Sequence, residues 1–217
     1  NSRDLALHAK DQKNFNNESL VKIIEKDPGA LSTIMVCTKD RANVFATIIG
    51  ILDSENINFL DAKLFGMKNG FCLDFITISN QAGEVISKNS SVAKSLTIRL
   101  KEALDQEVLS PKIVKRRQPK HLKHFNTDTI IEYKHDMTHR WTEIDIKTSD
   151  RPGLLASICQ VFLDHGALIR KARIATYGER AEDKFCITSK ENTPYLKKKD
   201  LEKLINDMSV SLSSANK

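Results

Sequence analysis

The chain has 217 residues, 40% of them hydrophobic, and a formal net charge of +6 from 34 basic and 28 acidic residues. This length allows one large or two small domains with packed cores. The first part of the chain is polar and charged, and no apolar run approaches the roughly eighteen residues that cross a membrane, which excludes a secretory signal and a membrane span and predicts a cytoplasmic protein.

The first half of the chain predicts two strands, a helix, two strands and a second helix. Ile34, Val36 and Thr38 alternate with their neighbours as in a strand that has one buried face. From Val44 the apolar residues follow helical spacing, and Asn56 is a residue type that tolerates the left-handed end of a helix. The predicted elements are strands at 20–25, 34–38, 57–67 and 73–79 and helices at 44–52 and 91–106.

The second half repeats this order. Residues 39–48 read K-D-R-A-N-V-F-A-T-I, and residues 149–158, which lie 110 positions later, read S-D-R-P-G-L-L-A-S-I. The patterns on either side of the two phrases also match, which indicates an internal duplication. The second set of elements comprises strands at 129–133, 144–148, 167–177 and 183–189 and helices at 154–162 and 198–208, the first of which ends near Gly166.

Each half therefore predicts an α+β domain of the ferredoxin-like kind with the order ββαββα. Only nine residues follow Met208, too few for a closing strand. We expect the strand that precedes each core strand to supply the edge strand instead, as in a circular permutation. The expected domain boundaries are 19–108 and 128–217, with 109–127 as a basic linker.

The loop that joins the first core strand to its helix is the candidate binding element. A helix that begins directly after a strand leaves its first N–H groups unpaired at the positive end of the helix dipole, which attracts carboxylates. We expect Gly153 to let a small ligand approach the backbone and Pro152 to set the first helical φ angle. Ala42-Asn43 in the first copy is less suited to close approach. The alternative is that D-R-P-G is only a stable turn.

The stretch D-R-P-G-L-L-A-x-I, followed by a helix and a β-hairpin, resembles the ACT domain, a ferredoxin-like regulatory module. The resemblance implies an amino-acid ligand at this loop, held against the edge of a second ACT domain in the same chain or in a homodimer. The ligand-binding residues that it implies are Asp150, Arg151, Pro152, Gly153, Leu154 and Leu155. In the first copy a second site would use Asp40, Arg41, Asn43, Val44 and Asp61, unless that copy is only a structural partner.

Three further stretches resemble the C-terminal region of the bacterial bifunctional uridylyltransferase/uridylyl-removing enzymes: S-R-D-L-A-L-H at 2–8, R-R-Q-P-K-H-L-K-H-F at 116–125 and A-R-I-A-T-Y-G-E-R-A-E-D-K-F at 172–185. The resemblance implies that residues 1–18 are the tail of a hydrolase domain and that this chain is a regulatory, non-catalytic piece of a longer enzyme. It implies glutamine as the sensed ligand and the PII signal protein as the partner of the whole enzyme. Magnesium or another divalent metal would serve catalytic domains outside this chain.

The chain departs from the family pattern at one place in the second copy. The family has an acidic residue just before A-R-I, whereas this chain has Arg170-Lys171; the first copy keeps Asp61 before Ala62-Lys63. If that acid holds the ammonium group of the ligand, the basic pair changes the polarity of the pocket wall and with it the choice of amino acid.

The remaining reactive residues predict no catalytic or metal site. The cysteines are far apart among apolar neighbours, which predicts buried reduced thiols at Cys37, Cys72, Cys159 and Cys186. The doublet His135-Asp136 falls in a predicted turn without further ligands. His121 and His124 lie in a basic run that repels cations, so we expect them to be structural.

Two other functions stay open from the sequence alone. The paired sheets could hold dimers or dock PII and bind no small molecule, because sheet edges and helix faces are available for contact. A self-contained enzyme or an RNA-binding module is less favoured. The basic run at 112–123 could contact nucleic acid, but Phe71 and Phe75 are better suited to the core than to stacking on bases.

Overall fold

The structure is a computed structural model. It describes residues 18–25, 31–41, 43–67, 69–107, 128–151, 153–177, 179–195 and 197–213. The predicted basic linker, with His121 and His124, and nearly all of the predicted hydrolase tail lie outside these residues.

The described elements fall into two repeats with the same order. Repeat 1 contains β1 (Leu20–Glu25), β2 (Ser32–Lys39), α2 (Val44–Ser54), β3 (Asn58–Gly66), β4 (Phe71–Ser79) and α3 (Ser91–Leu104). Repeat 2 contains β5 (Ile130–Asp136), β6 (Trp141–Ser149), α4 (Leu154–Asp164), β7 (Leu168–Arg173), β8 (Thr176–Tyr177), β9 (Arg180–Thr188) and α5 (Lys198–Ser213).

The strands form one antiparallel sheet that runs through both repeats. Its order is β1-β2-β4-β3-β7-β9-β6-β5, and β8 pairs with β9 beside this path. The strand that precedes each core strand lies at an outer edge of the sheet, where β1 pairs antiparallel with β2 and β5 with β6. The predicted ferredoxin-like arrangement, with its edge strand supplied from before the core, is therefore confirmed.

The repeats meet along a short pairing of β3 with β7, which we call the seam. It joins Asp61 to Arg173, Ala62 to Ala172 and Lys63 to Lys171. Ala62 and Ala172 occupy the same position in their repeats, so the seam is centred on an axis that relates one repeat to the other. The seam has three paired positions, whereas β2 and β4 share eight, and it is the narrowest junction along the main strand path, from β1 to β5, of the described sheet.

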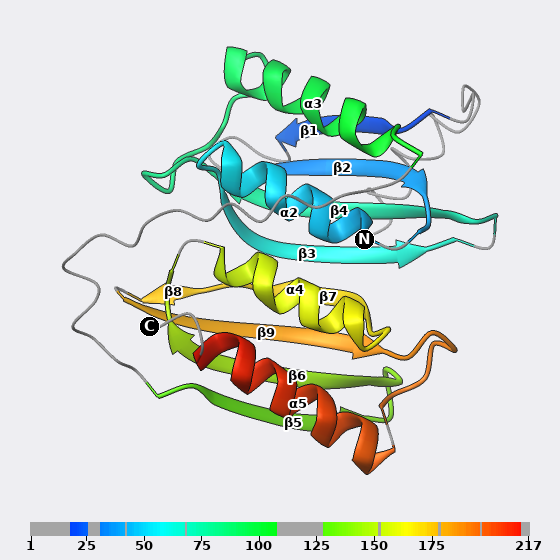
Figure 1. Cartoon of the computed structure of the whole chain (residues 1–217). Coiled ribbons are helices and arrows are strands. Elements are labelled where there is room, and N and C mark those ends of the chain that lie inside the picture. The colour runs from blue at the N-terminus through cyan, green and yellow to red at the C-terminus, as the bar shows by residue number, and fades with distance from the viewer. Residues whose placement is uncertain are drawn as a thin grey trace.

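The helices of the described residues, α2, α3, α4 and α5, cover the same face of the sheet (Figure 1). Their apolar sides and the inward side chains of the strands form one hydrophobic core that continues from repeat 1 into repeat 2. Each half also has an edge-on aromatic pair, at positions that do not correspond: Phe45 packs against Phe59 in repeat 1, and Phe162 packs against Phe185 in repeat 2. The four cysteines are free and buried in this framework, as predicted. Among the described residues, no helix has both the length and the apolar composition to span a membrane.

The helices end as the sequence predicts, because Asn56 and Gly166 both have left-handed φ angles, of 56° and 63°. The predicted strand 167–177 is wrong in one respect, since it breaks into β7 and β8. At the break, Ile174 N–H donates to the carbonyl of Leu60 across the seam, and Ala175 accepts from Glu182 N–H. Helix α5 also continues to Ser213, five residues past the predicted end, because Leu212 still faces the core.

The doublet His135-Asp136 lies at the end of β5 and not in the turn, which corrects its predicted place. Asp136 organises the turn that follows, because its carboxylate accepts hydrogen bonds from the N–H groups of Thr138 and His139. Phe75 is buried, as expected for a core residue.

Candidate ligand pocket

The loop between the core strand and the helix has the same backbone shape in both repeats. Helices α2 and α4 begin at Val44 and Leu154, and the residue before each has a left-handed conformation, with φ of 72° at Asn43 and 76° at Gly153. Asparagine and glycine are the residue types that adopt this region most readily. The expectation that Pro152 begins the helix is wrong, and the backbone does not distinguish the two copies in the way that the sequence suggested.

Each loop is attached to the hairpin of its own repeat. Asp40 N–H donates to Gly70 O at 2.9 Å, and Asp150 N–H donates to Glu179 O at 2.8 Å. In repeat 2, Leu154 N–H is already taken by the carbonyl of Arg151 at 3.1 Å. The N–H groups without an acceptor inside helix α4 are therefore those of the first turn that follow it, at Leu155 and Ala156.

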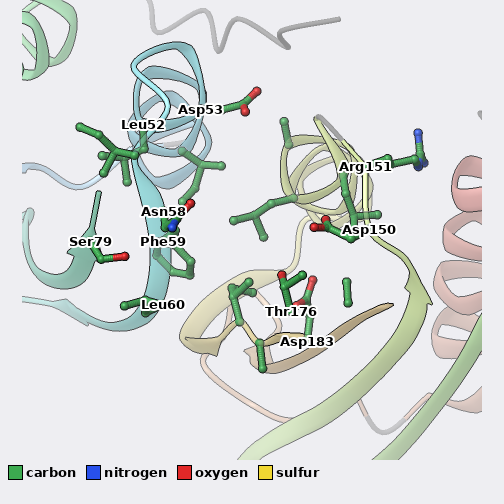
Figure 2. A pocket seen from close by; sticks show the side chains of 18 of the residues that line it. Leu52, Asp53, Asn58, Phe59, Leu60, Ser79, Asp150, Arg151, Thr176 and Asp183 are labelled. Carbon is green, nitrogen blue, oxygen red and sulfur yellow. The ribbon is translucent and has the colours of Figure 1, made fainter. Parts of the chain in front are cut away.

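A cavity of about 850 Å³ opens beside the repeat 2 loop and extends across to repeat 1 (Figure 2). This volume lies within the range of roughly 300–1,000 Å³ that small-molecule sites occupy. Repeat 2 contributes the loop, the start of α4 and the region of β8 and β9. Repeat 1 contributes the end of α2 and the start of β3. The repeat 1 side chains labelled in Figure 2 are Leu52, Asp53, Asn58, Phe59, Leu60 and Ser79.

The cavity gathers one of the two predicted sets of site residues. Asp150, Arg151, Gly153, Leu154 and Leu155 all line it, and Pro152 lies outside the described residues. None of the second set lines it, that is Asp40, Arg41, Asn43, Val44 and Asp61. A binding role for the first set stays a prediction, but its members do share one cavity.

Two carboxyl groups of repeat 2 line this cavity, and we call Asp150 and Asp183 the open acid pair. Asp183 comes from β9 and is only 3% exposed. No donor among the described residues reaches its Oδ1 atom. Burial and then the charge of Asp150 raise the pKa of Asp183 to about 7, although an N–H bond from Ala175 opposes the shift. Burial also raises the pKa of Asp150.

Arg41 and Arg151, the arginines of the two repeated D-R sequences, each bond to the C-terminal end of a helix. Arg151 Nη2 donates to the carbonyl of Ser211 in the last turn of α5 at 3.4 Å, and Figure 2 shows its guanidinium directed away from Asp150. Arg41 donates to the carbonyls of Leu104, Gln106 and Glu107 at the end of α3. A cation at a helix C-terminus is stabilised by the helix dipole. Both arginines thus join the loop to the second helix of their repeat.

The basic pair Arg170-Lys171 does not alter the wall of this cavity. Neither residue lines it, because the seam places the third strand of each repeat beside the loop of the other. Leu60 of repeat 1 lines the cavity together with the repeat 2 loop, while Arg170 of repeat 2 lies near the repeat 1 loop. A Cβ atom on Gly66 would lie 3.1 Å from Asp40 Oδ2 and 3.6 Å from Arg170 Nη1.

Sequence reasoning missed Asp183 and the residues with which repeat 1 lines the cavity, although the resemblance implied that the edge of a second ACT domain would hold the ligand. Asp183 was detectable, because Asp74 occupies the equivalent place: β2 pairs Val36 with Asp74, and β6 pairs Ile146 with Asp183. A buried acid repeated in both copies of a strand is a signal of its own. The repeat 1 wall could not be found, since no local pattern specifies which strands meet at the seam.

Among the described residues, no three histidine, cysteine, aspartate or glutamate side chains come close enough together to hold a metal ion. The cavity is lined mainly by apolar side chains, beside the acids Asp53, Asp150 and Asp183.

Comparison with known proteins places the chain in an enzyme family. It is 37% identical over 175 residues to a bifunctional uridylyltransferase/uridylyl-removing enzyme of a Psychrobacter species, a match that covers 80% of this chain. The enzyme of the same name from Vibrio campbellii is 32% identical over 218 residues and covers 95% of this chain. The chain is a homologue of one segment of these enzymes. The two matches span 19% and 24% of the length of those relatives. No model of a known protein family matches the sequence.

Solved structures give weaker matches. A protein described as a putative glycine cleavage system transcriptional repressor is 14% identical, with a TM-score of 0.29 over 85% of this chain and 91% of its own. The ligand-free regulatory subunit of aspartate kinase from Thermus thermophilus is 14% identical, with a TM-score of 0.24 over 87% and 88% of the two chains. At these scores the likeness supports no argument about this chain.

Proposed function

We propose that the chain is the amino-acid-sensing region of a uridylyltransferase/uridylyl-removing enzyme that acts on the PII signal protein, and that glutamine binds in the cavity between the two repeats. Its role is regulatory, and the catalytic groups with their divalent metal belong to other parts of a longer enzyme. The observation that carries the proposal is the position of the cavity, which joins the D-R-P-G loop of one repeat to the third strand of the other.

The groups around the cavity suit a neutral amino acid. The N–H groups of Leu155 and Ala156, at the positive end of α4, match a carboxylate. Asp150 and Asp183 oppose a second carboxylate, because it would add a negative charge to a buried acidic site. Glutamine therefore fits better than glutamate, from which it differs in this one group.

Binding at this place would act through the seam. A ligand that contacts both repeats favours the arrangement in which they are paired over any in which they part. Only such a difference in affinity between two arrangements can shift an equilibrium. With three paired positions, the seam is the junction between neighbouring strands of the main sheet path whose separation breaks the fewest strand pairings. We propose that this junction transmits the glutamine signal to the catalytic domains.

Calorimetric titration of this chain tests the proposal. We expect saturable binding of glutamine and much weaker binding of glutamate. Gly153→Asp places a negative charge where the ligand carboxylate would lie, so it should abolish binding. Gly153→Asn is the matched control, because it adds a neutral side chain of the same shape that repeat 1 already accommodates at Asn43.

The outcome also separates sensing from docking. A ligand raises the unfolding temperature as its concentration increases, by mass action. A module that only docks PII or holds dimers would respond to protein partners and to none of the twenty amino acids. Flat titrations with all twenty would refute glutamine sensing and favour the docking function.

A further inference from the structure

Each repeat contains a pair of acids in equivalent positions. In repeat 1 the pair is Asp40 at the loop and Asp74 on β4, which we call the closed acid pair. The open acid pair in repeat 2 is Asp150 and Asp183. Asp74 and Asp183 are each 3% exposed, and each has an Oδ1 atom that no described donor reaches. Each also accepts a backbone N–H, Asp74 from Phe65 on β3 and Asp183 from Ala175 at the break between β7 and β8.

The two third strands differ at one equivalent position, and this position lies on the side of the other repeat's acid pair. Both third strands carry a β-bulge, and the extra residue is Leu60 in β3 and Arg170 in β7. A bulge redirects the side chain at its extra residue, often beside a functional site. Because the seam crosses the repeats over, Arg170 lies near the closed acid pair, whereas Leu60 lines the cavity that the open acid pair borders.

Arg170 provides the closed pair with a positive charge. Its Nη1 atom and the Asp40 carboxylate lie on either side of Gly66. The negative charges of Asp40 and Asp74 stabilise the guanidinium against the burial that lowers its pKa. Its Nε atom donates to Thr188 Oγ1 at 3.1 Å, and Nη2 bonds Asn192 Oδ1, so the side chain is held in place.

We propose that the open acid pair is a receptor for a cationic nitrogen of the ligand, such as the ammonium group of an amino acid, and that Arg170 fills the equivalent receptor in repeat 1 from within the chain. Asp183 is buried, aimed into the cavity and short of one donor, and Leu60 brings neither a donor nor a charge. A ligand ammonium supplies both. This inference rests on the proposed function for its choice of ligand.

The arrangement also explains why repeat 2 needs no acidic residue just before its A-R-I sequence to hold a ligand in the cavity. The residue at that place, next to Arg170, belongs to the strand that faces repeat 1. The groups that would hold the ammonium in the open cavity instead come from the repeat 2 loop and from β9.

The test compares ligands with and without the nitrogen on variants with and without the acid. Wild type, Asp183→Asn and Asp74→Asn are titrated with glutamine, with 4-carbamoylbutanoate, which is glutamine without its α-amino group, and with n-butylammonium. We expect Asp183→Asn to weaken glutamine binding at least 30-fold and Asp74→Asn, whose site lies outside the cavity, to stay within threefold of wild type. The deaminated analogue should not bind measurably.

The outcomes separate this inference from the proposed function. If the deaminated analogue binds within threefold of glutamine, or if Asp183→Asn binds glutamine as wild type does, the receptor is overturned and glutamine sensing stands. If no amino acid binds but n-butylammonium binds wild type and not Asp183→Asn, the receptor stands and glutamine sensing is overturned. If nothing binds, both are overturned.

Discussion

The two repeats share a fold, a loop conformation and a pair of buried acids, but they differ in what crosses the seam to meet those acids. Arg170 of repeat 2 places a guanidinium beside the acids of repeat 1, whereas Leu60 of repeat 1 leaves a cavity beside those of repeat 2. The equivalent bulges of the two third strands thus carry different side chains, leucine in repeat 1 and arginine in repeat 2. The copy that keeps its cavity is also the copy with glycine at the start of the helix.

The largest effect should follow from making repeat 1 imitate repeat 2. Leu60→Arg would bring a guanidinium to the open acid pair, as Arg170 does for the closed pair, and would occupy the space of the ligand. We expect glutamine affinity to fall more than about 100-fold, which corresponds to about 3 kcal/mol. Calorimetry measures this loss. Leu60→Met is the control, because methionine is a long, flexible side chain like the introduced arginine but has no charge. An equal loss of affinity in Leu60→Met would show that packing, and not charge, is responsible.

The next effect concerns the acids in the absence of ligand. In the folded protein the pKa of Asp183 is about 7, above its ordinary value of 3.8. The folded state therefore binds more protons than the unfolded state between about pH 4 and 7, and stability falls as the pH rises through this window. Above it, Asp183→Asn should stabilise the chain, by about 1 to 3 kcal/mol at pH 8, and below pH 4 it should have little effect.

Denaturant unfolding of Asp183→Asn and Asp74→Asn at pH 5 and pH 8 provides the comparison. Asp183 has Asp150 nearby, whose charge raises its pKa, and shares the cavity lining with Asp53, Arg151 and Tyr177. Burial and then the charge of Asp40 also raise the pKa of Asp74 to about 7, and Arg170 is among the groups that oppose this shift. Asp74→Asn removes a partner of the buried Arg170 guanidinium as well, so it should gain less. Equal gains for the two variants at pH 8 would mean that Arg170 does not compensate the closed pair.

The two loop arginines should differ by a smaller amount. Arg41 reaches three carbonyls at the end of α3, whereas Arg151 has one contact, at 3.4 Å, with α5. Arg41→Met should cost about 1 to 2 kcal/mol of unfolding free energy and Arg151→Met less than about 0.5 kcal/mol. Chemical denaturation measures both. A larger loss in Arg151→Met would contradict the described contacts.

The smallest effect is expected at the start of α4. Gly153→Asn should cost less than about 1 kcal/mol, because asparagine tolerates a left-handed backbone and Asn43 already adopts it in repeat 1. Gly153→Val should cost more, since a β-branched residue is strained there. If the unfolding temperatures of both variants match that of wild type, the backbone at Gly153 is not left-handed in solution.

The sequence predicts the fold well because the alternation of apolar residues in strands, the helical spacing and the turn residues are local signals. Because the chain is duplicated, each of these signals occurs in both copies. It also predicts that the D-R-P-G loop borders the candidate site. It could not predict the other wall. The positions of Leu60 and Arg170 depend on the antiparallel pairing of β3 with β7, which is centred on Ala62 and Ala172. Nothing in the sequence near Ala62 and Ala172 indicates that these two strands pair. The break after β7 has the same origin, because the amide of Ile174 bonds across the seam to Leu60.

The most direct measurement is the number of glutamine molecules bound per chain, determined by calorimetry for wild type and for Arg170→Leu. The account predicts one molecule for wild type, in the cavity beside Asp150 and Asp183, and a second for Arg170→Leu, whose closed acid pair loses its internal cation. Two equivalent sites in wild type, or no binding to either protein, would contradict it.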